Sequence, residues 1–257
     1  MDQPAIELRG LRKVFRMIHQ RHGTLKRAAL NLLRRQKKEW VVAIDHLDLE
    51  VAHGETLAVI GRNGSGKSTL LGILSRVYRP TAGIVKVNGK IAPLLELGAG
   101  FHPDLNGIEN IYLDASILGL SRRQTSERLD SILEFAFVEP GRDLRSFADI
   151  PVRNYSDGMK MRLGFSVAIH TDPDILLVDE VLAVGDELFQ HRCLKKISEF
   201  QQAGKTIIFV SHQLWVIEKV ATRIIWLQDG RMVADGEPAS ILARYREAEV
   251  SGPSPPA

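Results

Sequence analysis

A glycine-rich stretch from Gly61 to Ser68 has the residue types and the spacing of a phosphate-binding loop. It reads GRNGSGKS, which fits the pattern GxxxxGK[ST], and it follows a short apolar strand expected over Thr56–Ile60. Glycine lets the backbone wrap closely around phosphates, and N–H groups at the start of the following helix favour their negative charge. Lys67 can reach the β and γ phosphates, while Ser68 can place its hydroxyl on Mg²⁺. The other residues expected to bind phosphate here are Gly61, Asn63, Gly64, Ser65, Gly66 and Thr69.

Two neighbouring carboxylates follow a second apolar strand. The segment Ile175–Glu180 reads ILLVDE, so the strand would deliver both acids to the edge of the sheet where ligands gather. Asp179 would hold Mg²⁺ through water, and Glu180 would orient and polarise the attacking water as general base. A strand that ends in acids is often only a solvated strand end. Its combination with the glycine-rich loop favours nucleotide hydrolysis.

A cluster of small polar residues opens a helix ahead of this strand. Tyr155 to Met159 reads YSDGM, and Asp157 precedes Asp179 by 22 residues. Serine and glycine N–H groups at a helix start form a second phosphate cradle. The alternative is a serine N-cap with an acid in the first turn, which is a common structural motif. The spacing to Asp179 favours the binding role, for which the expected residues are Tyr155, Ser156, Asp157 and Gly158.

These residues need a sheet that carries them to one edge. Strands are expected over Ile6–Phe15, Val41–Val51, Thr56–Ile60, Ile84–Val87, Ile175–Val178, Thr206–Val210 and Ile224–Leu227. Helical stretches between several of them predict an α/β fold with a largely parallel sheet and a small antiparallel part. Residues from about 104 to 169 are helical with loops, which predicts a helical subdomain inserted into the sheet core. We expect one domain over residues 1–250 and a disordered tail over 251–257.

Length and composition exclude several classes of protein. The chain has 257 residues, 44% of them hydrophobic and 25% charged, as in an ordinary globular protein. The single cysteine, Cys193, cannot form an internal disulfide and is expected to be a small core residue in a reducing compartment. The sequence contains no run of about 18 apolar residues, so no membrane-spanning helix is expected. The first ten residues do not have the pattern of a secretory signal. The net charge of +3 does not indicate nucleic-acid binding.

Together, GRNGSGKS, ILLVDE and YSDGM resemble the motifs of the nucleotide-binding domain of ABC (ATP-binding cassette) ATPases. The resemblance implies a P-loop core that binds ATP and Mg²⁺ and two subunits that pair head to tail. Ser156 and Gly158 would then contact the γ phosphate of ATP bound to the partner's P-loop. Asp186, in VGD, matches the D-loop residue of that interface, and His212, in VSHQ, matches the switch histidine that contacts the γ phosphate.

For two roles in the family pattern, the sequence does not decide which residue takes the role. The loop expected to carry a glutamine reads LLELGAGFHPDLNGIEN and has no Gln, so Glu96 is the nearest polar substitute for contact with Mg²⁺ or water. The aromatic residue that stacks on adenine would be Phe15, by its place at the end of the opening strand, or Trp40, by its distance from Lys67. The insertion between them does not allow a choice.

The particular residues of three motifs narrow the resemblance to one subfamily. YSDGM, DEVLAVGD after the catalytic strand, and LLELGAGFHPDLNGIEN are similar to the polysaccharide-export subfamily, over about Glu7 to Ala248. This implies an ATPase subunit, peripheral on the cytoplasmic face of the inner membrane. It would drive export of capsular polysaccharide, lipid-linked O-antigen or teichoic acid through a separate dimeric permease. Some O-antigen members add a carbohydrate-binding domain, which we do not expect after the last helix near 238–249.

Two other functions fit ATPase motifs: a soluble ABC ATPase acting on nucleic acid or ribosomes, and a binding-only regulatory subunit. DNA-organising relatives place very long coiled coils between P-loop and catalytic strand, whereas Lys67 and Asp179 are 112 residues apart here. Translation-factor relatives carry two cassettes per chain. The intact set of Lys67, Ser68, Asp179, Glu180 and His212 argues against a regulator, so an ATPase coupled to transport is expected.

A basic insertion separates the first two expected strands. Residues 16–40 hold eight Lys or Arg and one acid, Glu39, with apolar residues spaced for one helical face. It could be a solvated amphipathic helix. For an export subunit we prefer contact with the permease or with anionic lipid headgroups, where each Lys or Arg contributes about 1 kcal/mol. Nucleic-acid binding ranks last, because aromatic interleaving is missing.

Overall fold

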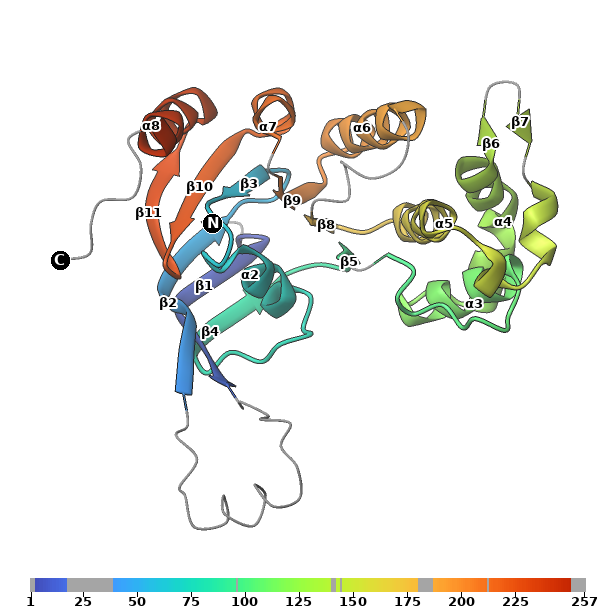
Figure 1. Ribbon diagram of the computed structural model, residues 1–257, viewed down its shortest axis with the longest axis horizontal. Helices are drawn as coiled ribbons and strands as arrows, with labels where there is room; N and C mark the ends of the chain where they lie inside the picture. Colours follow the sequence, from blue (N-terminus) through green and yellow to red (C-terminus); the bar gives the residue numbers. More distant parts are fainter. Residues whose placement is uncertain are drawn as a thin grey trace, which may run out of the picture.

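The core of the fold is a six-stranded sheet (Figure 1). The computed structural model describes residues 3–17, 39–95, 97–139, 142–143, 145–179, 187–211 and 213–250. The strand order is β11-β10-β3-β9-β8-β5, with β3 at Thr56–Ile60, β5 at Ile91–Leu94, β8 at Ile175–Asp179, β9 at Thr206–Val210, β10 at Arg223–Gln228 and β11 at Arg231–Gly236. Only the β10–β11 pair of this sheet is antiparallel. Strands β3 and β9 are buried along their whole length, which explains their continuous apolar sequences.

Three further strands form a smaller antiparallel sheet in the order β2-β1-β4. They are β1 at Ile6–Met17, β2 at Glu39–Val51 and β4 at Ala82–Val87. The strand expected over Ile84–Val87 belongs to this sheet, because β4 pairs antiparallel with β1. Its residues alternate, so that Val85 and Val87 pack on the core while Lys86 is exposed. Such a pattern is typical of a strand with one solvated face.

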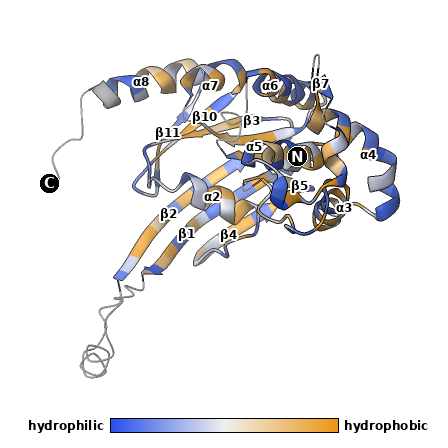
Figure 2. Cartoon of the chain, turned by 45° about the vertical axis from the view of Figure 1, so that its right-hand side comes forward, coloured by the Kyte–Doolittle hydropathy of each residue, from blue (hydrophilic) through white to orange (hydrophobic). Residues whose placement is uncertain are grey.

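Helices and the smaller sheet cover the two faces of the six-stranded sheet. On one face, α2 (Lys67–Leu74) and the inner face of the antiparallel sheet share a hydrophobic cluster with alternate residues of the central strands. The other face packs against α5 (Asp157–Ile169), α6 (Glu187–Gln202), α7 (Leu214–Val220) and α8 (Pro238–Val250). Figure 2 shows strands coloured mainly as hydrophobic and outer helices of mixed character. Each large apolar side chain fully buried between these layers contributes about 1.5–3 kcal/mol.

Cys193 lies on α6 within the second of these clusters and is 1% exposed. Burial raises the pKa of its thiol to about 12. The prediction of a small core residue is therefore confirmed.

A separate cluster of helices follows β5 in the chain. It contains α3 (Gly107–Ile117), α4 (Arg122–Phe137), the start of α5, and the short 3-10 turns η1 (Arg145–Asp149) and η2 (Val152–Asn154). A two-residue pair, β6 (Val138–Glu139) and β7 (Arg142–Asp143), connects α4 to these turns. The helical cluster has its own hydrophobic core, which joins α3, α4 and α5. Both α3 and α4 begin with capping boxes, Asn106 with Glu109 and Ser121 with Gln124, which satisfy N–H groups at their starts.

Two of the expected segments lie partly or wholly outside the described residues. The two ends of the basic insertion, 16–17 and 39–40, continue strands β1 and β2 rather than a helix, so its boundaries are corrected there. Residues 18–38 and the tail 251–257 lie outside the described part of the chain. Within the described part, no helix is both long and apolar enough to cross a bilayer.

Candidate active site

The loop after β3 takes the backbone shape that a phosphate cradle requires. Gly61, Gly64 and Gly66 have positive φ angles of 146°, 82° and 108°. A Cβ atom on Gly66 would lie 2.5 Å from the carbonyl oxygen of Ala43, so only glycine fits between this loop and β2. The glycine pattern thus serves both the φ angles and the close approach of a neighbouring strand.

Lys67 is held inside the loop at the start of α2. Its side chain is 6% exposed, and Nζ donates hydrogen bonds to the carbonyl oxygens of Gly61 at 2.7 Å and Arg62 at 3.0 Å. The hydroxyl of Ser65 is buried and has no hydrogen-bond partner in the described structure, and no side chain caps α2. An ammonium, an unpaired hydroxyl and an uncapped helix start together fit a phosphate group. Asn63, Gly64 and Ser68 are exposed beside them.

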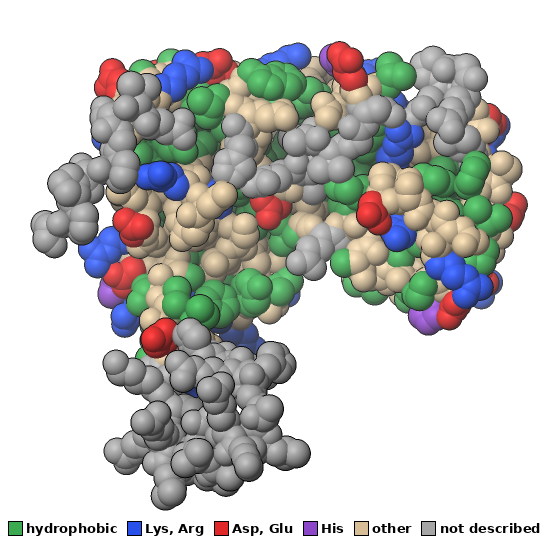
Figure 3. All heavy atoms as spheres, in the orientation of Figure 1, with side chains coloured by type: hydrophobic (Ala, Val, Ile, Leu, Met, Phe, Trp, Pro, Cys, Tyr) green, Lys and Arg blue, Asp and Glu red, His purple; other side chains and the backbone are tan. Residues whose placement is uncertain are grey.

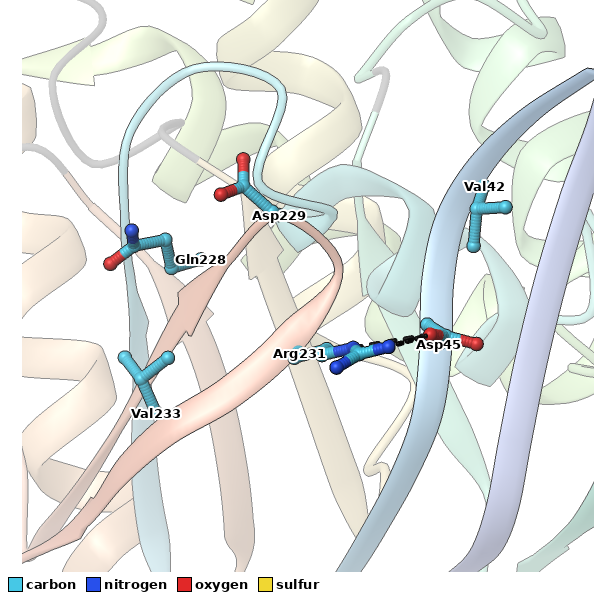
Figure 4. Close-up of a pocket in the computed structure, with 6 residues that line it drawn as sticks. All are labelled: Val42, Asp45, Gln228, Asp229, Arg231 and Val233. Carbon is cyan, nitrogen blue, oxygen red and sulfur yellow. Dashed lines mark hydrogen bonds and ion pairs between the residues drawn. The ribbon is translucent and has the colours of Figure 1, made fainter. Parts of the chain in front are cut away.

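The turn between β10 and β11 braces this loop from outside, and sequence reasoning missed it. The N–H of Gly230 donates to the carbonyl of Ser65 at 3.1 Å, and the N–H of Asp45 donates to the carbonyl of Gly230 at 2.8 Å. Figure 4 shows Arg231 reaching across to Asp45, where its guanidinium donates at 2.6 and 3.1 Å. The sequence signal was Asp229-Gly230, a dipeptide that favours a two-residue hairpin turn after a strand.

A shallow pocket of about 480 Å³ lies beside this brace (Figure 4), lined by Val42, Asp45, Gln228, Asp229, Arg231 and Val233. Asp45 is only 16% exposed and also pairs with Arg12 and His46, at 3.4 and 2.9 Å. Hydrogen bonds from Arg231 and then from His46 lower the pKa of the Asp45 carboxyl. Asp45 therefore stays ionised and joins both sheets next to the phosphate loop.

The first of the two predicted acids, Asp179, lies at the same edge of the sheet as this loop. Asp179 ends β8, is half-buried and pairs in register with Val210 of β9, and β9 lies next to β3. Glu180, Asp186, His212 and Glu96 lie outside the described residues. The strands that precede Glu96, Glu180 and His212 are β5, β8 and β9, which are parallel to β3 and end at the same edge.

The YSDGM segment lies on the helical cluster, away from the phosphate loop. Figure 1 shows α2 and the helices α3 and α4 on opposite sides of β5. Ser156 is exposed and caps α5, because its Oγ accepts from the N–H of Met159 at 3.3 Å. The side chain of Asp157 is 96% exposed, and Gly158 is half-buried in the first turn. This start of α5 therefore presents polar groups to solvent.

Tyr155 is placed behind that surface. Its ring is 5% exposed and packs edge-on against Phe137, and its hydroxyl donates to the carbonyl of Phe147 at 2.6 Å. Burial raises the pKa of the Tyr155 hydroxyl to about 12. The side chain thus supports the loop before Ser156 from within the helical core.

The two aromatic candidates for adenine stacking lie on opposite faces of the β1–β2 hairpin. Phe15 pairs with Val41 and Trp40 pairs with Arg16, so the two rings come from successive pairs. Phe15 is half-buried, packs edge-on against Tyr78 with a ring distance of 5.3 Å, and lies under Lys13. Trp40 is 61% exposed. Of the two, only Trp40 offers a largely uncovered ring.

Comparison with known proteins places the chain in a family. Residues 44–183 match the family described as ABC transporter, and the chain belongs to it. The fold agrees with a dimeric ATP-binding cassette solved in a post-hydrolysis state with ADP and Pi, at a TM-score of 0.72 and 22% identity, over 91% of this chain and 98% of that one. The predicted ABC ATPase fold, with its small antiparallel part, is confirmed.

More similar sequences belong to exporters. The chain is 42% identical to the O-antigen export system ATP-binding protein RfbB of Klebsiella pneumoniae, over 96% of this chain and 99% of that protein. It is 44% identical to the protein of the same name in Myxococcus xanthus, over 95% of this chain but 56% of the length of that relative. It is also 39% identical to the teichoic acids export ATP-binding protein TagH of Shouchella clausii, over 95% of this chain and 66% of that protein.

Proposed function

We propose that this chain is the ATP-hydrolysing subunit of an ABC exporter that moves a lipid-linked polysaccharide across the cytoplasmic membrane through a separate permease. The observation that carries the proposal is the similarity to RfbB of Klebsiella pneumoniae, which extends over 99% of that export protein. TagH, a second kind of relative, is named as an ATP-binding protein for the export of teichoic acids. The substrate class is therefore a cell-surface glycan polymer.

In this function the loop after β3 binds the phosphates of ATP. Gly61, Asn63, Gly64, Ser65, Gly66 and Thr69 form the cradle. On binding, Lys67 would exchange its bonds to the Gly61 and Arg62 carbonyls for bonds to the β and γ phosphates. Binding would therefore cost little free energy for ordering the loop, because the glycine angles and the Gly230 brace fix its shape beforehand.

Hydrolysis is assigned to the sheet edge. Ser68 and Asp179 are the residues that would hold Mg²⁺, which neutralises charge on the phosphates when bound. Glu180, next in the chain after β8, orients the attacking water and takes its proton as general base. His212, which follows β9, contacts the γ phosphate, and Glu96 after β5 contacts the water or the metal.

The YSDGM surface acts on the ATP of a second copy. Ser156 and Gly158, with Asp157 beside them, complete the partner's phosphate site, and Asp186 contacts the partner at the same interface. The support is geometric: Ser156 is exposed at the start of α5, and Figure 1 shows the helical cluster apart from the chain's own α2. Tyr155 keeps this surface in place from behind.

Trp40 is the better candidate to stack on adenine. A stacking ring needs an accessible face, and Trp40 is 61% exposed while Phe15 is covered by Tyr78 and Lys13. Phe15 then remains a packing residue near the end of β1.

The membrane-facing part of the proposal concerns location and partner. We place the subunit on the cytoplasmic face of the membrane, where a dimer of it binds a dimeric permease, and where residues 16–40 contact the permease or anionic lipid. On the face of the molecule that Figure 3 shows, Lys and Arg side chains are interspersed with Asp and Glu over the described residues. That mixture does not favour a soluble ATPase that acts on nucleic acid.

The test is to identify the membrane partner. A tagged Glu180→Gln protein, which is expected to hold ATP without turnover, is purified from detergent-solubilised membranes of its natural host. A polytopic permease recovered in near-equal amounts supports the proposal. Recovery of ribosomes or DNA without a membrane protein would contradict it.

A further inference from the structure

Asn110 is fully buried in the first turn of α3, and its side chain bonds the loop that precedes the helix. Its Oδ1 accepts the N–H of His102 at 2.7 Å. Its Nδ2 faces three carbonyl oxygens, those of His102 at 3.1 Å, Leu105 at 3.1 Å and Asn106 at 2.9 Å. The amide therefore ties both ends of the loop 102–106 to the start of α3.

The same loop is bonded to the segment in front of the signature serine. The carbonyl of Leu105, which Asn110 already binds, also accepts the N–H of Val152 at 2.9 Å. The carbonyl of Pro103 accepts the N–H of Arg153 at 3.0 Å. These bonds join two stretches of chain that are separated by all of α3 and α4.

Two further contacts strengthen this junction. Asp104 and Arg153 form an ion pair of 2.6 Å, and both side chains are exposed. Asn106 forms an isolated antiparallel bridge with Pro151. Ser156 follows Arg153 by three residues, so the junction sets where α5 begins.

We propose that Asn110 is a positioning residue for the signature motif. It fixes the loop 102–106, the loop fixes residues 151–153, and Ser156 is thereby held in the position from which it meets the partner's ATP. The inference rests on the proposed function, because it assumes that Ser156 acts across a dimer interface. Asn110 itself does not touch nucleotide in this scheme.

An amide is the only side chain of this size that satisfies the site. An aspartate would place a carboxylate oxygen against three carbonyl oxygens and would lose the donor, with almost no change in volume. An alanine would leave the buried backbone groups of the loop without their partner. Asn110→Asp therefore breaks the junction chemically while keeping the packing of α3.

The experiment measures dimer formation and nucleotide binding separately in the full chain. In the Glu180→Gln background, sedimentation velocity with ATP gives the dimer association constant, and calorimetry with ADP gives the affinity of the single subunit's own phosphate loop. We expect Asn110→Asp to weaken ATP-driven association at least about tenfold, as expected when buried polar groups lose their partners. The ADP affinity should stay within about twofold.

The matched control is Thr125→Val in the same helical cluster. Thr125 is 1% exposed and donates one buried hydrogen bond to the Ser121 carbonyl at 3.1 Å, far from the junction in the chain. It should leave association within about twofold, since it removes one buried hydrogen bond without touching the junction. If it weakens association as strongly as Asn110→Asp does, general loss of stability explains both and the inference is overturned.

The exposed ion pair of Asp104 and Arg153 gives variants that are expected to fold even if Asn110→Asp does not. Asp104→Arg and Arg153→Asp should each weaken association about two- to threefold, and the double exchange should restore it. If Asn110→Asp does not fold, these variants decide: restoration in the double exchange supports the junction, and unchanged association in both single variants overturns it.

Ser156→Ala separates this inference from the proposed function. If Ser156→Ala weakens the dimer while Asn110→Asp and both charge variants do not, the inference fails and the composite site stands. If Ser156→Ala leaves the dimer intact as well, the proposed composite site itself is contradicted.

Discussion

The two proposed phosphate-binding elements of this chain are built in different ways. The loop after β3 is anchored at both ends by regular structure, and its shape follows mainly from its glycine angles and from the bond of Lys67 to Gly61, with the Gly230 turn as an outer brace. The YSDGM surface opens α5, and the chain leading to it is held by Tyr155, which packs on Phe137, and by the backbone bond between Val152 and Leu105. The first element is specified mainly by its own residues, while the second depends on the whole subdomain.

In the proposed function, residues at the sheet edge carry out hydrolysis and the helical cluster completes the ATP site of a second copy. The largest effect is therefore expected for Glu180→Gln, which removes the proposed general base. Phosphate release should fall at least about 100-fold, because general base catalysis contributes about 10²–10⁴. ATP binding and ATP-driven dimer formation should persist. Near-normal hydrolysis by this variant would show that another group activates the water.

A pair of glycine substitutions tests whether the backbone is more tightly constrained in the loop after β3 than at the start of α5. Gly66→Ala should weaken nucleotide binding at least about tenfold, because the residue has a φ of 108° and its Cβ would meet the Ala43 carbonyl. Gly158→Ala has room, since its Cβ would meet only the Ser156 Oγ at 3.9 Å. It should raise stability by about 0.5–1 kcal/mol through helix propensity. Calorimetry with ADP and urea unfolding measure the two quantities, and equal loss of ADP affinity in both variants would remove the distinction.

Tyr155→Phe tests whether the helical cluster supports its surface from within. The change deletes the hydroxyl that donates to the Phe147 carbonyl and should lower the free energy of unfolding by about 1–2 kcal/mol. ADP affinity of the single subunit should not change. A variant as stable as the wild type would show that packing of the ring on Phe137 suffices.

The smallest effect is expected at the brace of the phosphate loop. Asp45→Asn should raise the dissociation constant for ATP about twofold, as a partly exposed ion pair is worth little. Asp235→Asn is the control, because Asp235 binds Arg223 in the same hairpin, with both bonds at 2.6 Å, but at its other end. An equal change in both variants would mean that the brace does not act on the loop.

The same carboxyl gives a pH dependence with a defined sign. The pKa of Asp45 is lowered in the folded protein, so its contribution to stability is present above the unfolded pKa of about 3.9 and is lost as pH falls through the folded value. The difference in Tm between wild type and Asp45→Asn should be present at pH 5 and shrink as the pH falls below about 4. A difference that grows as the pH falls from about 5 to about 3 would reverse the assignment.

The contrast also explains what could be predicted from the sequence. GRNGSGKS and the strand before it are contiguous, and the ABC fold that they indicate is confirmed. The sequence predicted strand β4 but not the sheet that it joins, although the alternation of the strand carried that information. Asp45 and Arg231 could not be found, because their contact joins residues 186 positions apart in the chain. Asn110 bonds residues close to it, but the loop that it holds contacts residues 152–153, which lie far away in the chain. The difference between Phe15 and Trp40 required the register of the hairpin and the position of Tyr78.

Cys193 has a practical consequence for following this protein in motion. Maleimide and nitroxide reagents react with thiolates, and a buried thiol with a pKa of about 12 remains protonated and inaccessible at neutral pH. A cysteine introduced at an exposed position outside the proposed sites, such as Arg122 on α4, would therefore be modified selectively in the otherwise native chain. Spectroscopic rulers between two copies could then record how far the subunits approach each other in each nucleotide state, without a cysteine-free background.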